Sequence, residues 1–231
     1  MKFANAQHFA HTGFLTNKNL NFYLPKIYPI TDTRLSQLSH TEQVKKLIAG
    51  GAEFIQLREK YLSPKSFYED ALEAIKIARA ANVKIIINDR VDLALALKAD
   101  GVHLGQNDLS PTKARKILGK NAIISFSTHN FQQATEALKL PIDYVAIGPV
   151  FATKTKENPD QIIGIEGVKK VREVIGNFPL VAIGGINSAR FLEVLDAGAN
   201  SVAIISDLLA EADNITEKMK DFIKKTQNNN K

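Results

Sequence analysis

The chain has 231 residues, of which 45% are hydrophobic, and it contains no cysteine. This length suits one domain around a single core, and the lack of cysteine excludes a disulfide framework and a thiolate metal site. The 30 lysine and arginine residues outnumber the 24 acidic ones, for a net charge of +6, but they form no arginine-rich stripe interleaved with aromatic residues. The basic balance therefore favours small anionic substrates, rather than nucleic acid, as partners.

The first 26 residues carry three lysines and no acidic residue, and polar residues interrupt every apolar stretch. No run in the chain approaches the roughly 18 apolar residues that a membrane-spanning helix needs, and the first segment has no secretory signal pattern. We interpret residues 1–26 as an N-terminal extension and expect a cytoplasmic protein without a membrane partner. The sequence leaves the oligomeric state open, with a homo-oligomer among the options.

From residue 27 onward, short β-rich runs alternate with amphipathic stretches, a pattern typical of βα units and a parallel sheet. The runs predicted to be strands are residues 27–31, 53–57, 84–87, 101–104, 122–125, 143–147, 180–183 and 201–205. The stretches predicted to be helices are residues 41–49, 64–80, 90–98, 111–118, 130–139, 165–175, 188–197 and 213–225. Serine followed by proline, at Ser63-Pro64 and Ser110-Pro111, places a capping residue before two of these helices.

This alternation predicts an α/β fold of one domain, a compact (β/α)₈ or TIM barrel over residues 27–225, because such barrels have about 250 residues or somewhat fewer. A doubly wound open sheet is the alternative, although it would usually have fewer strands and a switch in strand order. The polar tail, residues 226–231, is expected to be disordered.

In a barrel of this kind the chemistry collects in the loops after the strands, and the unusual residues of this sequence fall there. These motifs are Gln56-Leu57-Arg58-Glu59-Lys60, Asn88-Asp89, Gly105-Gln106-Asn107-Asp108, Ser127-Thr128-His129, Thr153-Lys154-Thr155-Lys156, Gly184-Gly185-Ile186-Asn187 and Ser206-Asp207. Because the carboxyl ends of all the strands lie at one end of a barrel, we expect these motifs to surround one site.

Asp89 and Asp108 are carboxylates at the same end of neighbouring predicted strands. Hard oxygen ligands of this kind suit Mg²⁺, which takes one or two carboxylates and completes its shell with water and substrate phosphate. Asp89 could instead cap the helix that follows it. Asp108 is less easily explained as a cap, because Ser110 already precedes the next helix.

Arg58, Lys60 and Lys156 offer cations after the second and sixth predicted strands, and both residue types suit a diphosphate. The alternative is that Arg58 pairs with Glu59 at the surface and that the loop lysines are solvated, an interpretation that we favour for Lys154. Gly184-Gly185 and the turn at Ile205-Ser206 follow the last two strands, where barrels commonly bind phosphate through backbone N–H groups.

Two of the histidines lie near the expected site. His103 is inside a predicted strand, and we interpret it as a packed core residue. His129 lies at the expected functional rim, where it is either an acid or base or a hydrogen-bonding loop residue.

Taken together, the motifs above resemble the thiamine-phosphate synthase family, and they do so in the family's order over residues 27–225. Further carriers of the resemblance are Gly101-Val102-His103-Leu104, directly before the Gly105 motif, and Gly148-Pro149-Val150-Phe151. The resemblance implies a transferase of thiamine biosynthesis that joins a pyrimidine diphosphate to a thiazole phosphate with Mg²⁺ and releases pyrophosphate.

The resemblance also implies roles for particular residues. The pyrimidine diphosphate would be held by Gln56, Leu57, Arg58, Glu59, Lys60, Asn88 and Ser127, with Lys156 on the diphosphate. The thiazole phosphate would be held by Thr153, Lys154, Thr155, Gly185, Ile205 and Ser206. Asp89 and Asp108 would bind Mg²⁺, and the catalytic set would be Arg58, Lys60, Ser127 and Lys156.

Two positions depart from the family pattern: Ser125 stands where glycine is usual, and Ala152 where proline is frequent. Three other functions stay open. A related thiazole tautomerase would use His129 for proton transfer, a non-catalytic barrel would sense phosphorylated metabolites, and a phosphosugar isomerase would need one rim carboxylate as base. The first two would not need Lys60, Asp89 and Asp108 together.

Overall fold

The computed structural model of the chain describes residues 23–153, 155 and 160–228. The strands are β1 (Ile27–Thr31), β2 (Phe54–Leu57), β3 (Lys84–Asn88), β4 (Gly101–Leu104), β5 (Ile123–Thr128), β6 (Tyr144–Ile147), β7 (Leu180–Ile183) and β8 (Ser201–Ile204). The helices are α1 (Thr33–Ser36), α2 (His40–Ala49), α3 (Pro64–Ala80), α4 (Val91–Leu97), α5 (Pro111–Leu118), α6 (Phe131–Ala137), α7 (Gly164–Ile175), α8 (Phe191–Asp196), α9 (Ser206–Leu209), the 3₁₀ helix η1 (Ala212–Asn214) and α10 (Ile215–Asn228).

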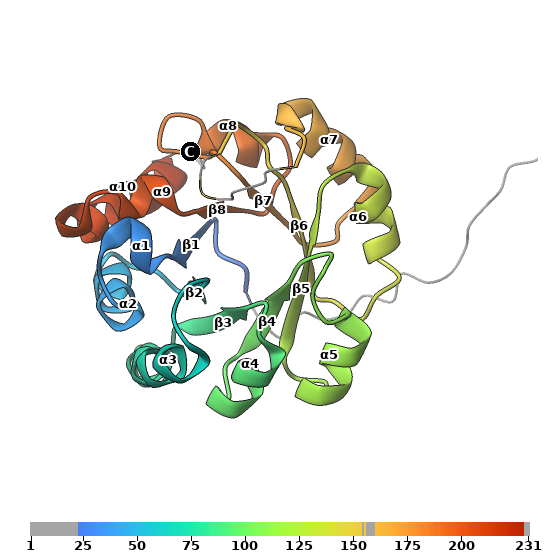
Figure 1. Cartoon of the computed structure of the whole chain (residues 1–231). Coiled ribbons are helices and arrows are strands. Elements are labelled where there is room, and N and C mark those ends of the chain that lie inside the picture. The colour runs from blue at the N-terminus through green and yellow to red at the C-terminus, as the bar shows by residue number, and fades with distance from the viewer. Residues whose placement is uncertain (1–22, 154, 156–159, 229–231) are drawn as a thin grey trace, which may run out of the picture.

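The strands are parallel and follow one another in chain order around a closed barrel, which pairing between β1 and β8 completes (Figure 1). The long helices pack outside the strands, so that every strand is covered by helix on its outer face (Figure 1). This arrangement confirms the predicted single-domain (β/α)₈ barrel and rules out an open sheet. Within the described part of the chain, no helix is both long and apolar enough to cross a membrane.

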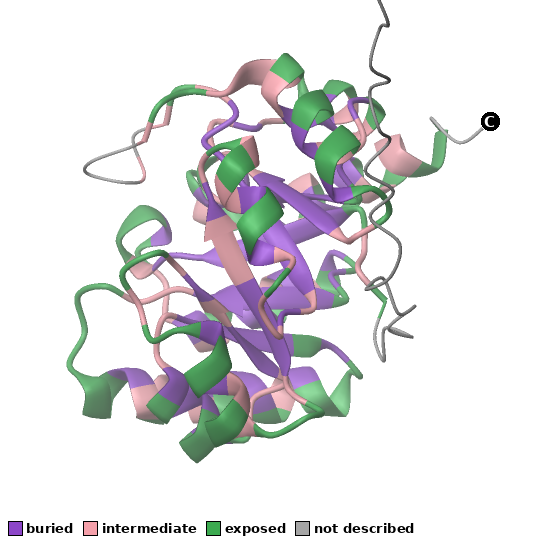
Figure 2. Ribbon diagram, turned by 90° about the vertical axis from the view of Figure 1, so that its right-hand side faces the viewer, coloured by how far each residue is buried: buried purple, intermediate pink, exposed green. Residues whose placement is uncertain are grey.

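Side chains along each strand alternate between the barrel interior and the layer under the helices, because successive residues of a strand point to opposite faces. In β2, for example, Phe54 belongs to the apolar cluster inside the barrel, whereas Ile55 and Leu57 belong to the outer core. Figure 2 shows the strands mostly buried and the outward faces of the helices exposed. The alternation decides which residue at the end of each strand can reach the barrel mouth.

Two ends, one of a strand and one of a helix, lie furthest beyond the residues that the sequence predicted. Strand β5 continues to Thr128, because Ser127 and Thr128 pair with Ala146 and Ile147 of β6 instead of forming a loop. Helix α10 continues to Asn228, so the first three residues of the predicted disordered tail are helical. The rest of the predicted tail, residues 229–231, lies outside the described residues, as do residues 1–22 of the predicted extension.

Candidate active site

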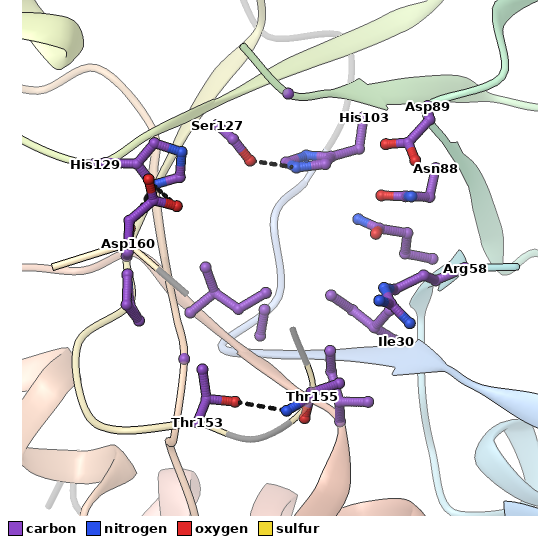
Figure 3. Close-up of a pocket in the computed structure, with 18 of the residues that line it drawn as sticks. Ile30, Arg58, Asn88, Asp89, His103, Ser127, His129, Thr153, Thr155 and Asp160 are labelled. Atoms are coloured by element: carbon purple, nitrogen blue, oxygen red, sulfur yellow. Dashed lines mark hydrogen bonds and ion pairs between the residues drawn. The ribbon is translucent and has the colours of Figure 1, made fainter. Parts of the chain in front are cut away.

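A cavity of about 510 Å³ opens at the carboxyl ends of the strands, where residues from all eight strands or their following loops line it. Twelve of the residues predicted for the site contribute to its walls: Gln56, Arg58, Lys60, Asn88, Asp89, Asp108, Ser127, Thr153, Thr155, Gly185, Ile205 and Ser206. Figure 3 shows Arg58, Asn88, Asp89 and His103 on one side of the cavity and His129 and Asp160 on the other. The fold therefore brings most of the predicted set together.

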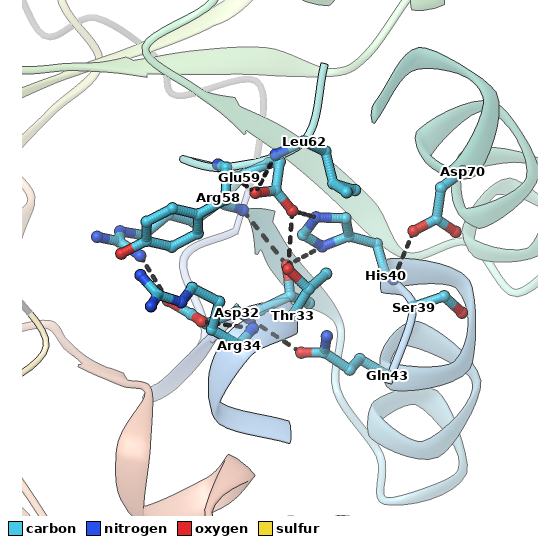
Figure 4. Close-up of polar contacts among 12 residues, drawn as sticks. Asp32, Thr33, Arg34, Ser39, His40, Gln43, Arg58, Glu59, Leu62 and Asp70 are labelled. Carbon is cyan, nitrogen blue, oxygen red and sulfur yellow. Dashed lines mark hydrogen bonds and ion pairs between the residues drawn. The ribbon is translucent and has the colours of Figure 1, made fainter. Parts of the chain in front are cut away.

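Two predicted substrate-binding residues do not reach this cavity. Leu57 is fully buried in the layer between strands and helices, because it follows the inward-facing Gln56 and so points outward. The carboxylate of Glu59 turns away, toward the hydroxyl of Thr33 at 2.9 Å and the ring of His40 at 3.1 Å (Figure 4). The predictions for Lys154 and Lys156 fall outside the described residues.

The cationic corner of the cavity is built from the loop after β2. One guanidinium nitrogen of Arg58, Nη1, lies 2.5 Å from Oδ2 of Asp32, and the other oxygen of Asp32 accepts the amides of Arg34 and Leu35 at the start of α1. A guanidinium carries several N–H donors, so this contact fixes its orientation while leaving capacity for an anion. Arg58 therefore pairs with Asp32 and not, as the alternative interpretation had it, with Glu59.

Asp89 does not cap the helix after it, because α4 begins after Arg90 and has no side-chain cap. Its backbone is left-handed, with φ of 62°, and its carboxylate forms an ion pair with Nζ of Lys60 inside the cavity wall. Left-handed backbone is uncommon outside glycine and occurs more readily in aspartate and asparagine. This conformation places the side chain of Asp89 at the barrel mouth, directly after β3.

Asp108 also lines the cavity, where its carboxyl group interacts with that of Asp89. Its Oδ2 also accepts the amide of Gly105 at 2.7 Å, which closes the turn after β4. Burial raises the pKa of Asp108, and the neighbouring charge of Asp89 raises it further, while the Gly105 amide and Lys60 act in the opposite direction. Two neighbouring carboxylate groups repel each other unless a proton or a cation lies between them.

This donor set fits Mg²⁺. Within the described ranges, no group of three or more histidine, cysteine or acidic side chains is placed to hold a metal ion. Mg²⁺ does not need such a group, since it commonly takes one or two carboxylates and completes its shell with water and substrate phosphate. Asp89 and Asp108 supply hard oxygen ligands next to an open cavity.

His103 lines the cavity as well, although the sequence suggested a packed core residue. Its Nδ1 lies 2.7 Å from Oγ of Ser125. Its Nε2 lies 2.8 Å from Oγ of Ser127 (Figure 3). Burial lowers the pKa of His103 to about 4, Asp89 acts against this shift and Lys60 adds to it, so the ring is neutral near pH 7. The alternation of side chains along β4 would have indicated this position in the sequence. His103 shares the inward face with Gly101 and lies near the carboxyl end of the strand.

His129 lines the opposite wall and is held by the next strand's loop. Its Nδ1 lies 2.7 Å from the carbonyl oxygen of Gly148 and 3.4 Å from a carboxylate oxygen of Asp160. A carbonyl can only accept, so Nδ1 carries the hydrogen of this contact. The hydrogen-bonding role left open for His129 is therefore present in the structure.

Glycines shape the end of the cavity formed by β6, β7 and β8. Gly184 and Gly185 have φ of 102° and 63°, and a Cβ on Gly185 would lie 2.4 Å from the carbonyl oxygen of Ala152. The loop after β7 thus packs directly on the loop after β6, with backbone exposed to the cavity. Thr153, whose Oγ1 accepts the amide of Thr155 at 3.3 Å, borders the same region.

These features define the chain as a (β/α)₈ barrel whose mouth holds a cavity with paired carboxylates, adjacent cations and a glycine-lined end. Such a cavity suits small phosphorylated ligands bound with a divalent cation.

Comparisons with known proteins agree with this class. A sequence model of the family described as thiamine monophosphate synthase matches residues 27–208. The chain is 42% identical over 192 residues to a thiamine-phosphate synthase of Chloroflexus aurantiacus, covering 83% of this chain and 88% of the relative. It is 45% identical over 189 residues to a thiamine-phosphate synthase of Clostridium novyi, and the match covers 81% of this chain and 92% of the relative. A solved thiamine phosphate pyrophosphorylase from Pyrococcus furiosus has a TM-score of 0.79 and 35% identity, covering 88% of this chain and 96% of that one.

The chain belongs to the thiamine monophosphate synthase family. The resemblance seen in the motifs is thereby confirmed, and so is the fold that it implied.

Proposed function

We propose that the chain is a Mg²⁺-dependent thiamine-phosphate synthase, a transferase that joins an aminopyrimidine methyl diphosphate to a thiazole phosphate and releases pyrophosphate. The observation that carries the proposal is the carboxylate pair of Asp89 and Asp108 beside Arg58 and Lys60 at one cavity. The names of the relatives, thiamine-phosphate synthase in each case, support the same reaction. A cytoplasmic location is part of the proposal, in keeping with a chain that has no cysteine to oxidise.

The diphosphate would lie at the cationic corner. Arg58 offers a planar fork and Lys60 a point charge, and both line the cavity next to the carboxylate pair. Asp89 and Asp108 would hold Mg²⁺, which when bound supplies positive charge to the oxygen atoms of the diphosphate. Lys156, outside the described residues, keeps its predicted place on the diphosphate as part of the proposal.

The aminopyrimidine ring would lie deeper, among the polar side chains that end three strands. Gln56, Asn88 and Ser127 all line the cavity. Amide and hydroxyl groups can both donate and accept, which suits a ring that carries an amino group and two ring nitrogens.

The reaction needs one bond broken and one formed. The carbon–oxygen bond to the diphosphate breaks with its electron pair leaving on pyrophosphate, and the remaining pyrimidine methyl cation takes the lone pair of the thiazole nitrogen. Arg58 and Lys60 counter the negative charge that grows on the departing group. The nucleophilic nitrogen has no proton to lose, so the step requires no general base.

The thiazole phosphate would lie at the glycine-lined end. Thr153 and Thr155 after β6, Gly185 after β7, and Ile205 with Ser206 after β8 all border the cavity there. Backbone N–H groups in loops of this kind bind phosphate in many barrels, and hydroxyl groups add donors.

The alternative functions are less well supported. A tautomerase would use His129 as its acid or base, through Nε2, because Nδ1 of that ring donates to Gly148. Asp89, Asp108 and Lys60 all line the cavity. Neither a tautomerase nor a sensor needs these three residues together.

The proposal is tested by incubating the purified full chain with both substrates and Mg²⁺. We expect thiamine phosphate and pyrophosphate in equal amounts, and no product when either substrate is left out or when the metal is removed by a chelator. Absence of product with Mg²⁺ would favour a binding barrel, and full activity after complete metal removal would disprove the metal's role.

A further inference from the structure

The guanidinium of Arg58 is held by a carboxylate that lies behind the cavity wall. Nη1 of Arg58 donates to Oδ2 of Asp32 at 2.5 Å, and Asp32 is the one hydrogen-bond partner of this side chain among the described residues (Figure 4). The described residues that line the cavity include Arg58 but not Asp32. The two side chains are 15% and 7% exposed. Asp32 therefore reaches a ligand in the cavity through Arg58.

Asp32 is itself fixed at its other polar atoms. Its amide donates to Oε1 of Gln43 at 3.0 Å, and its carbonyl oxygen accepts the hydroxyl of Ser36 at 3.1 Å. Its Oδ1 accepts the amides of Arg34 and Leu35, both at 3.1 Å, as the N-cap of α1. The carboxylate is thus a fixed acceptor, because moving it would break the cap.

The backbone of Arg58 is held from the same end of β1. The amide of Arg58 donates to Oγ1 of Thr31, the residue before Asp32, at 3.3 Å. The hydroxyl of Thr33, the residue after Asp32, donates to the carboxylate of Glu59 at 2.9 Å. The turn that follows β1 therefore fixes Arg58 at both its backbone and its guanidinium.

We propose that Asp32 is a positioning residue that holds the guanidinium of Arg58 ready for the diphosphate of the substrate. A long side chain that is free loses rotamer freedom when it binds an anion, whereas one that is already held loses less. A guanidinium has several N–H groups, so donors remain for a ligand after one of them is given to Asp32. The identity of the anion as a diphosphate rests on the proposed function.

The charge of Asp32 and its positioning of Arg58 act on an anion in opposite directions, which makes Asp32→Asn informative. Loss of the negative charge alone would strengthen anion binding. The substitution also removes the acceptor for Nη1, because the asparagine oxygen would stay on the amides of Arg34 and Leu35 and its NH₂ group would face the guanidinium. Asparagine caps helices as well as aspartate does, so α1 should still form. Weaker anion binding in this variant would thus identify positioning.

The first test measures binding of inorganic pyrophosphate to the full chain with Mg²⁺ present, by isothermal titration calorimetry. We expect Asp32→Asn to raise Kd about tenfold, the effect of one hydrogen bond to a charged group, and Arg58→Ala to raise it at least as much. Asp32→Asn should add nothing when Arg58→Ala is already present, because the group through which it acts is gone. Unchanged or tighter binding by Asp32→Asn, or an equal loss in both backgrounds, would overturn the proposal.

The second test is steady-state kinetics, which separates positioning from a merely structural role. Asp32→Asn should raise the KM for the pyrimidine diphosphate and leave the KM for the thiazole phosphate nearly unchanged, because Arg58 lies at the diphosphate corner. A rise in both KM values by the same factor would show a general distortion and overturn the proposal. Asp32→Ser keeps a capping oxygen but has no second one for Arg58, so it should reproduce these results if Asp32→Asn does not fold.

Asp70→Asn is the matched control. The two carboxylate oxygens of Asp70, on α3, accept the amides of His40 and Thr41 at 2.7 and 3.0 Å in the first turn of α2. Asp70 is not among the described residues that line the cavity, so this variant should leave Kd and both KM values unchanged. An unsubstituted chain that neither binds pyrophosphate nor forms thiamine phosphate would contradict the proposed function and the positioning role together. An active chain whose Asp32→Asn variant is unaffected would contradict the positioning role alone.

Discussion

Nε2 of His40 lies 3.1 Å from Oε2 of Glu59, and the two side chains are 0% and 2% exposed (Figure 4). Oε1 of Glu59 accepts the backbone amides of Tyr61 and Leu62 at 2.6 and 3.0 Å. One carboxylate therefore ties the loop after β2 to the first turn of α2. Glu59 thus shapes the loop that presents Arg58 and Lys60, and its carboxylate is directed away from the cavity.

Glu59→Gln should destabilise the protein, and the effect should depend on pH. Burial alone would raise the pKa of Glu59, but hydrogen bonds with His40, Tyr61, Leu62 and Thr33 lower it to about 2. Because this pKa is below the unfolded value of about 4.3, the charged form stabilises the fold above that value. The contribution is lost as the pH falls toward 2. We expect a loss of about 2 kcal/mol at pH 7, measured by urea unfolding, that shrinks at acidic pH.

Glu69→Gln provides the control for this measurement. Glu69 lies on α3 with a side chain that is 65% exposed and 3.9 Å from Lys65. Exposed pairs of this kind contribute little, so its unfolding free energy should stay within about 0.5 kcal/mol of the unsubstituted chain. A Glu59→Gln effect that is equally small, or that does not change between pH 7 and acidic pH, would show that the buried hydrogen bonds do not stabilise the loop.

His129→Asn should retain most of the synthase turnover. The asparagine amide can replace the N–H that His129 donates to Gly148, and the proposed reaction needs no general base. Loss of a general base typically costs about a hundredfold or more, whereas we expect less than tenfold here. Steady-state assays of kcat at saturating substrates check this. A fall of about a thousandfold would favour proton transfer by His129.

Removing residues 1–22 should leave the fold intact. Every strand among the described residues begins at or after Ile27, and Leu24, which packs against the apolar cluster inside the barrel, is kept in this truncation. We expect the melting temperature to change by only a few degrees, as for a loss of roughly 1 kcal/mol or less. Calorimetry checks the value, and a large loss of soluble protein would contradict the expectation.

The sequence predicted the eight strands and their covering helices because each has its own hydrophobic period and boundary residues. It did not predict α1 and α9, which have four residues each and so are too short to show a helical period. It also ended β5 too early. Ser127 is polar because it faces the cavity, whereas in the sequence its polarity indicated the start of a loop.

Motif order alone could not separate residues that line the cavity from those that support it. Leu57 and Glu59 belong to the same motif as Arg58 and Lys60, yet strand alternation turns Leu57 outward and His40 holds Glu59 away from the cavity. The roles of His40 and Asp32 depend on contacts between segments far apart in the chain. Such contacts have no local sequence signal.

Asp89 and Asp108 are expected to act as one unit through a shared Mg²⁺ beside the diphosphate. The most direct measurement is a double-mutant cycle with Asp89→Asn and Asp108→Asn, reading kcat/KM across a Mg²⁺ titration. Asp92→Asn is the control, since Asp92 lies on α4 with a side chain that is 64% exposed and paired with Arg90. It should leave both kcat/KM and the Mg²⁺ dependence unchanged.

If one ion needs both carboxylates, either single substitution should remove most of the increase in kcat/KM that Mg²⁺ provides. It should also raise the Mg²⁺ concentration that gives the half-maximal rate. The second substitution should then cost little more, as for groups that work together. Excess Mg²⁺ should partly restore each single variant. Strictly additive losses with an unchanged Mg²⁺ dependence would contradict the shared ion, and the diphosphate would then have to be held by the cations alone.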